Sequence, residues 1–266
     1  MTRGIGIDFG TTNSAIASAG PDGIKVARFG AEFAVFRSIL FFEVERDWVL
    51  GYPPAWSGPA AIENYIESGA DGRLMQSLKS FLANRNLRAT NVLGRDFTLE
   101  RLVSEVVSGL RTAAGDQIGS LEGQPVAIGR PVRFAYSDGA EHDALAEERL
   151  RKSFALAGLP EVDVVYEPVA AALKYEATLD HDQVVLIADF GGGTSDFSLI
   201  RVGPSYAKAA GDPARIIGTA GLGVAGDTLD ARIVSNLVAP QLGQGGSYRD
   251  MTGEVLAFPQ WIFRRL

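Results

Sequence analysis

The chain has 266 residues, 46% of them hydrophobic, with a formal net charge of −7, two histidines and no cysteine. The acidic balance argues against a nucleic-acid partner, which needs a basic surface, and the lack of cysteine excludes a disulfide, a cysteine nucleophile and a Cys-ligated zinc site. No apolar stretch approaches the roughly 18 residues of a membrane helix, and Asp8 interrupts the first apolar run as a signal peptide would not, so we expect a soluble, cytoplasmic protein without a membrane partner.

The first half of the chain is predicted to combine strands and helices. Strands are expected at 4–9, 13–19, 24–29, 38–44, 126–128 and 162–166. A helix follows Thr98 as N-cap, because apolar residues recur at helical spacing over 99–110. A second helix over 140–157 ends at Gly158, and Pro168 suits the first turn of a third helix.

The second half repeats the opening plan. Strands are expected at 184–189, 197–202 and 215–219, followed by a glycine-rich loop over 221–226 and a helix over 227–238. A repeat at such long range predicts an α/β fold with two related lobes around a cleft, since a solenoid would have a shorter period. We expect a first lobe over 1–180, with an inserted subdomain at about 45–97, and a second, incomplete lobe over 181–266.

Two copies of one turn pattern carry the predicted chemistry. The first reads Asp8-Phe9-Gly10-Thr11-Thr12-Asn13, and the second runs from Asp189 through Gly191-Gly192-Gly193-Thr194 to Asp196. A glycine turn lets backbone N–H groups approach an anion closely, and an aspartate at a strand end holds magnesium, usually through water. Either turn alone also fits an ordinary hairpin or β-bulge. The pairing of two copies favours a site that binds a nucleoside triphosphate and its metal from both sides.

Four segments in order along the chain carry a resemblance to a known family: Gly6–Ser14, Tyr166–Leu173, Asp189–Ser198 and Gly226–Asp230. They resemble the nucleotide-binding domain of the seventy-kilodalton heat-shock protein family, within the actin-like ATPase superfamily. Asn13 stands where the main chaperones commonly have an aromatic residue, so the sequence is closest to a divergent, bacterial heat-shock-like branch. The resemblance implies an actin-like ATPase (ribonuclease H-like) fold, ATP or ADP as ligand, Mg²⁺, and ATP hydrolysis.

The resemblance also implies roles for the matching residues. Asp8 and Asp189 would hold the metal, largely through water. Nucleotide contacts would come from Gly10, Thr11, Thr12, Asn13, Gly191, Gly192, Gly193, Thr194, Gly223 and Gly226. Catalysis would involve Lys79, Glu167, Asp189, Thr194 and Asp196.

Three of these assignments have alternatives. Lys79 opens a segment similar to the family's Lys-Arg-Leu-Ile-Gly, but Arg73 is a rival and an exposed helical lysine is the plain alternative. Glu167 before Pro168 also fits an ordinary helix start. The loop over 221–226 also fits a simple strand–helix connection.

The resemblance also bears on how much activity to expect from this span of sequence. The resemblance implies about a hundred further residues, which supply most adenine contacts, so we expect a C-terminally truncated domain with weak or absent turnover. Unfolded peptide or a co-chaperone would bind through the missing regions, and the apolar end over 258–266 predicts self-association. An actin-like filament protein, a sugar or small-acid kinase and a non-catalytic interaction module are the alternatives.

Overall fold

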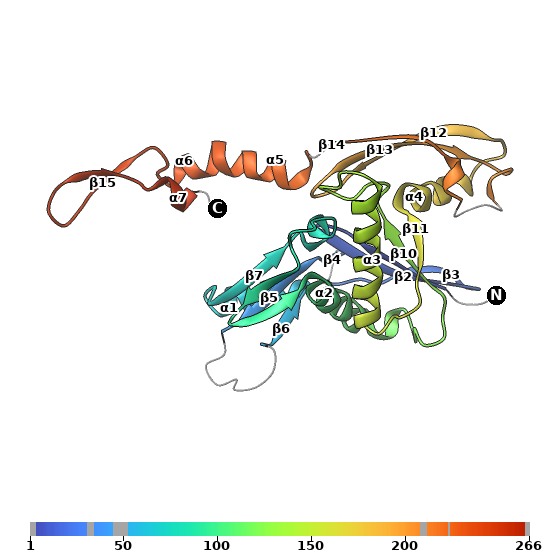
Figure 1. The fold of residues 1–266 in the computed structure, drawn as a ribbon, viewed down its shortest axis with the longest axis horizontal. Helices are drawn as coiled ribbons and strands as arrows, with labels where there is room; N and C mark the ends of the chain where they lie inside the picture. Colours follow the sequence, from blue (N-terminus) through green and yellow to red (C-terminus); the bar gives the residue numbers. More distant parts are fainter. Residues whose placement is uncertain (1–3, 31–34, 45–52, 208–211, 223, 264–266) are drawn as a thin grey trace.

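The computed structural model describes residues 4–30, 35–44, 53–207, 212–222 and 224–263. The first lobe is built on a sheet in the order β11-β10-β1-β2-β3, and β4 also pairs with β2 (Figure 1). Its strands are β1 (Gly4–Phe9), β2 (Asn13–Gly20), β3 (Gly23–Val26), β4 (Phe36–Arg37), β10 (Val126–Arg130) and β11 (Asp163–Tyr166). Strands β1, β10 and β11 are parallel, whereas β2 runs antiparallel to β1.

Alternation along β1 divides the two faces of this sheet. Ile5, Ile7 and Phe9 are buried in the core, whereas Gly6 and Asp8 are exposed on the other face, as a period of two residues requires. The core side is covered by α2 (Leu99–Ala114) and α3 (Ala140–Leu156), which pack on each other. The uncovered face is therefore available for a site.

The predicted caps and stops of the two long helices are found in the structure. Thr98 caps α2 by accepting a hydrogen bond from the Arg101 backbone N–H at 3.2 Å. Gly158 follows α3 with a φ of 82°, a backbone conformation that glycine adopts without strain. These local signals explain why both helices were predictable to within a few residues.

A small subdomain fills the region between β4 and α2. A three-stranded sheet contains β5 (Ile39–Glu43), β6 (Ala55–Ser57) and β7 (Gly72–Gln76), and α1 (Pro59–Glu67) packs on it. The 3-10 helix η1 (Leu78–Phe81) leads to the hairpin β8 (Ala89–Val92) and β9 (Arg95–Thr98). A short 3-10 turn, η2 (Gly115–Gln117), follows α2. Helix α1 has Pro59 at its first turn, where the missing N–H costs nothing.

The second lobe is an antiparallel meander. It contains β12 (Gln183–Phe190), β13 (Ser195–Val202) and β14 (Ile216–Leu222), with the short turn η4 (Pro213–Arg215) before β14. Helix α4 (Glu167–Glu176) packs against it, and Ala172, Ile200 and Val202 form their common core. A buried ion pair between Glu176 and Arg215, at 2.5 Å, also joins α4 to this lobe.

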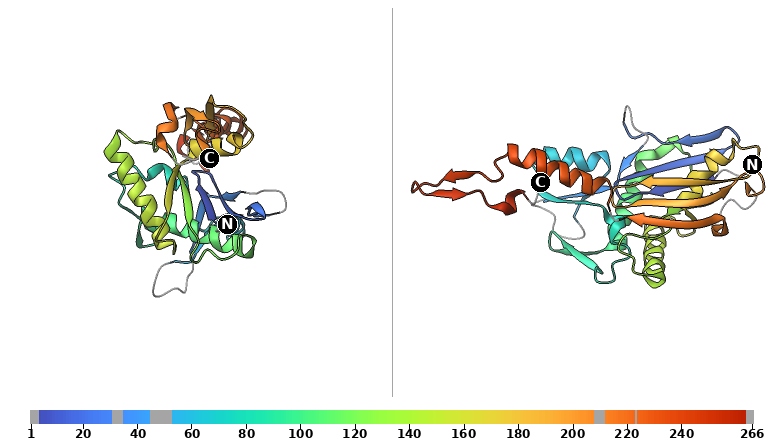
Figure 2. Two further views of the ribbon diagram at one scale, coloured as in Figure 1. Left: turned by 90° about the vertical axis from the view of Figure 1, so that its right-hand side faces the viewer. Right: turned by 90° about the horizontal axis from the view of Figure 1, so that it is seen from above.

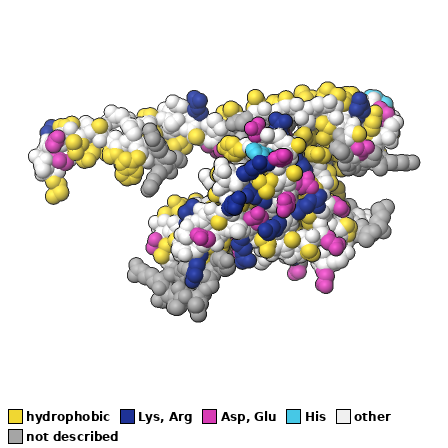
Figure 3. Space-filling view, in the orientation of Figure 1, with side chains coloured by type: hydrophobic (Ala, Val, Ile, Leu, Met, Phe, Trp, Pro, Cys, Tyr) yellow, Lys and Arg dark blue, Asp and Glu magenta, His cyan; other side chains and the backbone are white. Residues whose placement is uncertain are grey.

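The last elements form an arm that extends away from both sheets (Figures 1 and 2). The arm contains α5 (Gly226–Ile233), a π-helical turn η5 (Val234–Val238), α6 (Ala239–Gln241), the hairpin β15 (Ser247–Arg249) and β16 (Val255–Ala257), and α7 (Gln260–Phe263). Large apolar side chains are exposed along it, including Leu229, Ile233, Leu237, Leu242 and Trp261. Figure 3 shows such apolar side chains on the arm and along the outer surface of the second lobe. Of the apolar end over 258–266, the last three residues lie outside the described ranges.

Two expectations differ from the structure at element level. The strand expected at 24–29 ends at Val26, and the helix expected over 227–238 changes from α to π geometry after Ile233. Strand β6 and helix α1 lie in a region for which no element was predicted. In these segments the local sequence does not determine the type and end of the element, which depend on packing.

Candidate functional site

One cavity of about 960 Å³ lies between the lobes, and both predicted turns line it. A volume of this size is typical of a small-molecule or cofactor site. Its wall includes Asp8, Gly10, Thr11, Thr12, Asn13, Lys79, Glu167, Asp189, Gly191, Gly192, Gly193, Thr194, Asp196 and Gly226. The structure therefore brings together every predicted site residue except Gly223, which lies outside the described residues.

The first turn joins β1 to β2, where Phe9 pairs with Ser14. A Cβ on Gly10 would lie only 2.2 Å from the Asn13 carbonyl oxygen, so the turn requires glycine there. The Asn13 side-chain oxygen accepts a hydrogen bond from Arg37 at 3.1 Å. The turn thus leaves the backbone around Gly10 and Thr11 at the cavity wall.

The second turn joins β12 to β13, where Asp189 pairs directly with Asp196. It is closed by a hydrogen bond from the Gly191 N–H to the Thr194 carbonyl oxygen at 2.9 Å. The Thr194 hydroxyl donates to the Asp196 carboxylate at 2.7 Å. Both carboxylates are therefore held on either side of a loop of three glycines.

The two turns lie against each other. A Cβ on Gly192 would be 1.8 Å from the Thr12 hydroxyl oxygen, and one on Gly193 would be 3.0 Å from the Ser80 hydroxyl oxygen. A side chain at Gly192 would force the Thr12 side chain to move, so the absence of a Cβ suits this close approach. The geometry expected from the duplicated pattern, two turns on one shared cavity, is what the structure shows.

Lys79 lies in η1 and is buried, in contrast to the exposed lysine that was its plain alternative. Its Nζ contacts the Glu167 Oε1 at 2.6 Å, at the start of α4. Its rival Arg73 lies in β7, where it donates to the Asn91 carbonyl and to Thr90. Arg73 is not among the residues that line the cavity.

Two carboxyl groups in the cavity have raised pKa values. Burial raises the pKa of Glu167, and the charges of Asp8 and Asp189 raise it further, while the Lys79 ammonium opposes them. Burial also raises the pKa of Asp196, aided by Asp189 and opposed by the Thr194 hydrogen bond. Such shifts bring a carboxylate closer to the proton affinity that a general base needs near neutral pH.

The carboxylates fit a hydrated magnesium ion better than a dehydrated one. Among the described residues, no group of three or more His, Cys, Asp or Glu side chains is close enough to hold a metal directly. Mg²⁺ commonly keeps several waters and uses one or two carboxylates together with substrate phosphates. Asp8 and Asp189, on opposite turns of one cavity, are a donor set of that kind.

The start of α5 completes the contact between the lobes. The N–H groups of Gly226 and Asp227 donate to the Gly191 and Gly192 carbonyl oxygens at 3.1 Å and 2.9 Å. The Ser77 hydroxyl donates to the Asp227 carboxylate at 2.9 Å. Asp227 therefore connects the second turn to the segment that carries η1.

The sequence reasoning missed three polar residues here. Ser77, Asp227 and Arg133 were given no role, yet Ser77 and Asp227 join the lobes and Arg133 lines the cavity. Asp227 could have been noticed as the acidic residue that follows the glycine-rich loop over 221–226. Ser77 carries no local pattern, because its partner Asp227 lies 150 residues later. Arg133 also lies outside any local pattern, and only the fold brings it to the cavity.

Comparisons with known proteins identify similar sequences. A family model described as Hsp70 protein matches residues 77–240. The chain is 25% identical over 253 residues to the chaperone protein dnaK of Thalassiosira pseudonana, covering 90% of this chain and 39% of that protein. It is 30% identical over 208 residues to the chaperone protein DnaK of Cenarchaeum symbiosum (strain A), covering 76% of this chain and 29% of that protein. The chain thus spans less than half the length of these relatives. Within the described residues, no helix is both long and apolar enough to cross a membrane.

Proposed function

The chain belongs to the Hsp70 family, and on that premise we propose that its inter-lobe cavity binds ATP and ADP with Mg²⁺. The observation that carries the proposal is the meeting of two Asp-x-Gly turns in one cavity, whose wall also includes Lys79. Backbone amides freed by glycine suit phosphate oxygens. Both relatives are named as chaperone proteins, which favours this function over a filament protein or a sugar kinase.

The residues divide into three roles in this proposal. Asp8 and Asp189 hold a hydrated magnesium ion, which supplies charge neutralisation to the phosphates when bound. The two turns contact the phosphate oxygens through their backbone N–H groups and the Thr11 and Thr194 hydroxyls. Lys79 adds a positive charge, and its contact with Glu167 keeps both side chains in place.

Hydrolysis of ATP is proposed for the whole protein. Glu167 and Asp196 line the cavity with raised pKa values, which suits them to orient a water and accept its proton. Phosphoryl transfer needs mainly positioning and charge neutralisation, and the residues above supply both. For this span alone we expect weak or absent turnover. Binding of unfolded peptide or a co-chaperone, self-association through the apolar end over 258–266, and a cytoplasmic location also remain predictions.

Calorimetric titration tests the proposal. Mg·ATP and Mg·ADP should each bind the chain at one site, and binding should require Mg²⁺. Asp8→Ala and Asp189→Ala should each weaken binding by about tenfold or more, as expected for loss of a charge-assisted contact. Asp22→Ala, an exposed aspartate in the β2–β3 turn, is the matched control and should bind normally. Wild-type affinity in both cavity variants would refute the site, and steady-state phosphate release measures turnover separately.

A further inference from the structure

We propose that Arg133 is a phosphate-binding residue of this cavity and contacts the terminal phosphate of a bound nucleoside triphosphate. The inference rests on the proposed function and adds a residue to it. Arg133 lines the same cavity as the two turns. It lies three residues after the end of β10, outside both glycine turns.

The charges along the cavity wall single out this arginine. The described lining includes six carboxylates, Asp8, Glu167, Asp189, Asp196, Asp227 and Asp230. The same described lining contains two basic residues, Lys79 and Arg133. Lys79 is buried and committed to Glu167 at 2.6 Å. Arg133 is exposed, and no hydrogen bond or ion pair of its side chain occurs within the described ranges. A cation of this kind is free to meet an incoming polyanion.

Arg133 belongs to the wall that also carries Glu167. Strand β10 pairs in parallel with β11, and Arg130 is in register with Tyr166, the residue before Glu167. A Cβ on Gly129 would lie 3.0 Å from the Glu167 Cγ, so the end of β10 runs directly beside that carboxyl group. The proposed function assigns Glu167 to the water that attacks the terminal phosphate. Arg133 is therefore placed at the terminal-phosphate end rather than at the nucleoside end.

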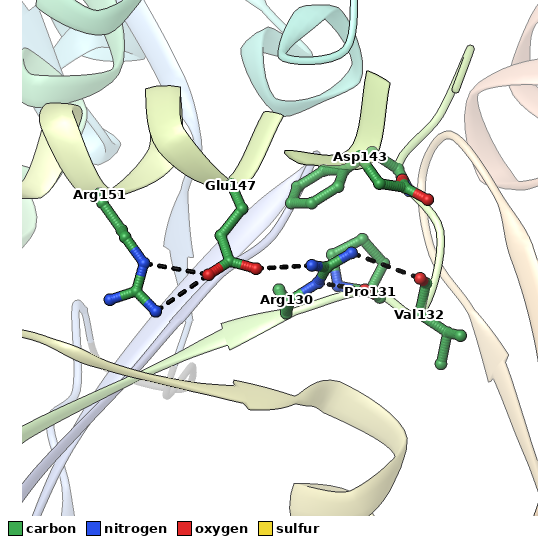
Figure 4. A network of polar contacts seen from close by, with 7 residues as sticks. Arg130, Pro131, Val132, Asp143, Glu147 and Arg151 are labelled. Atoms are coloured by element: carbon green, nitrogen blue, oxygen red, sulfur yellow. Dashed lines mark hydrogen bonds and ion pairs between the residues drawn. The ribbon is translucent and has the colours of Figure 1, made fainter. Parts of the chain in front are cut away.

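A polar network fixes the segment on which Arg133 lies (Figure 4). The Arg130 guanidinium donates to the Pro131 carbonyl oxygen at 2.9 Å and to the Val132 carbonyl oxygen at 3.4 Å. It also contacts Glu147 at 2.6 Å, and Glu147 in turn accepts from Arg151. The figure shows these side chains joining helix α3 to the loop after β10.

The same segment is held on the other side of Arg133. The Phe134 N–H donates to the Asp143 carboxylate at 2.9 Å. The Arg130 guanidinium also lies 5.0 Å from the Phe134 ring centroid and 5.2 Å from that of Tyr166, a stacked arrangement that orders both rings. The backbone is thus anchored immediately before and after Arg133. A charged donor on a fixed backbone loses less conformational entropy on binding.

The test compares ligands that differ in their phosphates. Mg·ATP, Mg·ADP and magnesium tripolyphosphate are titrated into wild type, Arg133→Ala, Arg133→Lys and Arg88→Ala. Arg88 is an exposed arginine outside the cavity and serves as the matched control. We expect Arg133→Ala to weaken Mg·ATP and tripolyphosphate by about tenfold and Mg·ADP by less than about threefold, because a bidentate charge-assisted contact is lost only for the terminal phosphate. Arg133→Lys should recover part of the loss, and Arg88→Ala should bind like wild type.

The outcomes separate this inference from the proposed function. Unchanged Mg·ATP affinity in Arg133→Ala, or an equal loss for ATP and ADP together with a lower unfolding midpoint, overturns the role of Arg133 alone. If wild type binds tripolyphosphate but no nucleotide, the proposed function fails. The role of Arg133 is then decided by the ratio of the tripolyphosphate affinities of wild type and Arg133→Ala. If wild type binds none of the three ligands, both are wrong.

Discussion

Replacing Lys79 with methionine should destabilise the protein by about 3 kcal/mol near neutral pH, because it leaves a buried carboxylate without its partner. Lys79 Nζ and Glu167 Oε1 are 2.6 Å apart, and their side chains are 8% and 20% exposed. The exposed fifth of Glu167 places the loss at the lower end of the range of about 3–5 kcal/mol measured for broken buried pairs. Asp8 and Asp189 add repulsion that no other described contact of Glu167 offsets.

The pH dependence of this loss follows from the pKa of Glu167. Burial, Asp8 and Asp189 raise that pKa, and Lys79 lowers it, so the variant should have a pKa raised still further. When the pKa of a carboxyl group is higher in the folded state than in the unfolded state, its ionisation destabilises the fold at high pH. This cost decreases as the pH falls below the folded pKa and is gone below the unfolded pKa. The deficit of Lys79→Met relative to wild type should therefore shrink on acidification.

Urea unfolding followed by circular dichroism measures this, at neutral pH and about two pH units lower. The double variant Lys79→Met/Glu167→Gln should be more stable than the sum of the single losses predicts, by about 1–3 kcal/mol. Lys152→Met, at an exposed position of α3, is the control. A deficit that is equal at both pH values, together with additive single losses, would show that the two side chains are not energetically coupled.

Three further predictions concern close contacts and charge. Gly192→Ala should weaken nucleotide binding by about tenfold or more, because its Cβ would be 1.8 Å from the Thr12 hydroxyl oxygen; titration with Mg·ADP measures this. Gly109→Ala should destabilise the protein, because its Cβ would be 1.7 Å from the Ser57 hydroxyl oxygen. This clash should outweigh the higher helix propensity of alanine, which is worth about 1 kcal/mol. In thermal unfolding, adding Ser57→Ala should restore stability. Glu147→Gln should lower the free energy of unfolding by about 1–3 kcal/mol at pH 7. Burial raises the pKa of Glu147, but the hydrogen bonds and charges of Arg130 and Arg151 lower it by more, so the pKa lies below the ordinary glutamate value. The loss caused by Glu147→Gln should therefore vanish as the pH falls below that ordinary value.

A control variant and the contrary outcomes show how these three predictions would be judged. Gly218→Ala, in β14 with nothing within 4 Å of its Cβ, should leave nucleotide binding unchanged. Full affinity in Gly192→Ala would mean that the turns can separate without loss. If Gly109→Ala is more stable than wild type, the helix tolerates the added methyl group and the contact with Ser57 yields. A pH-independent deficit in Glu147→Gln would attribute its effect to packing rather than charge.

The sequence predicted the parts of the fold that local pattern determines. The family match confirms the heat-shock assignment, and with it the α/β actin-like fold that the four segments implied. Helix α2 was predictable because its apolar spacing and the Thr98 cap act over a few residues. The paired turns were predictable because each carries its glycines and aspartates consecutively.

What could not be predicted depends on partners distant in the chain. The burial of Lys79 results from Glu167, 88 residues later, and the contact of Ser77 with Asp227 spans 150 residues. Helix α1 was not predicted because Gly58 and Gly69 flank it and Pro59 is its first residue, and all three are typical of turns. The π-helical turn after Ile233 has no proline or glycine within it to announce the change.

The contact between Gly192 and Thr12 limits how the two lobes can move. The turns already touch where a single methyl group would not fit, so further closure is sterically blocked. Relative motion is left with two directions, opening or rotation about this contact. At this point the distance between the two turns therefore has a lower limit, whereas the rest of the cavity wall is not restrained by this contact.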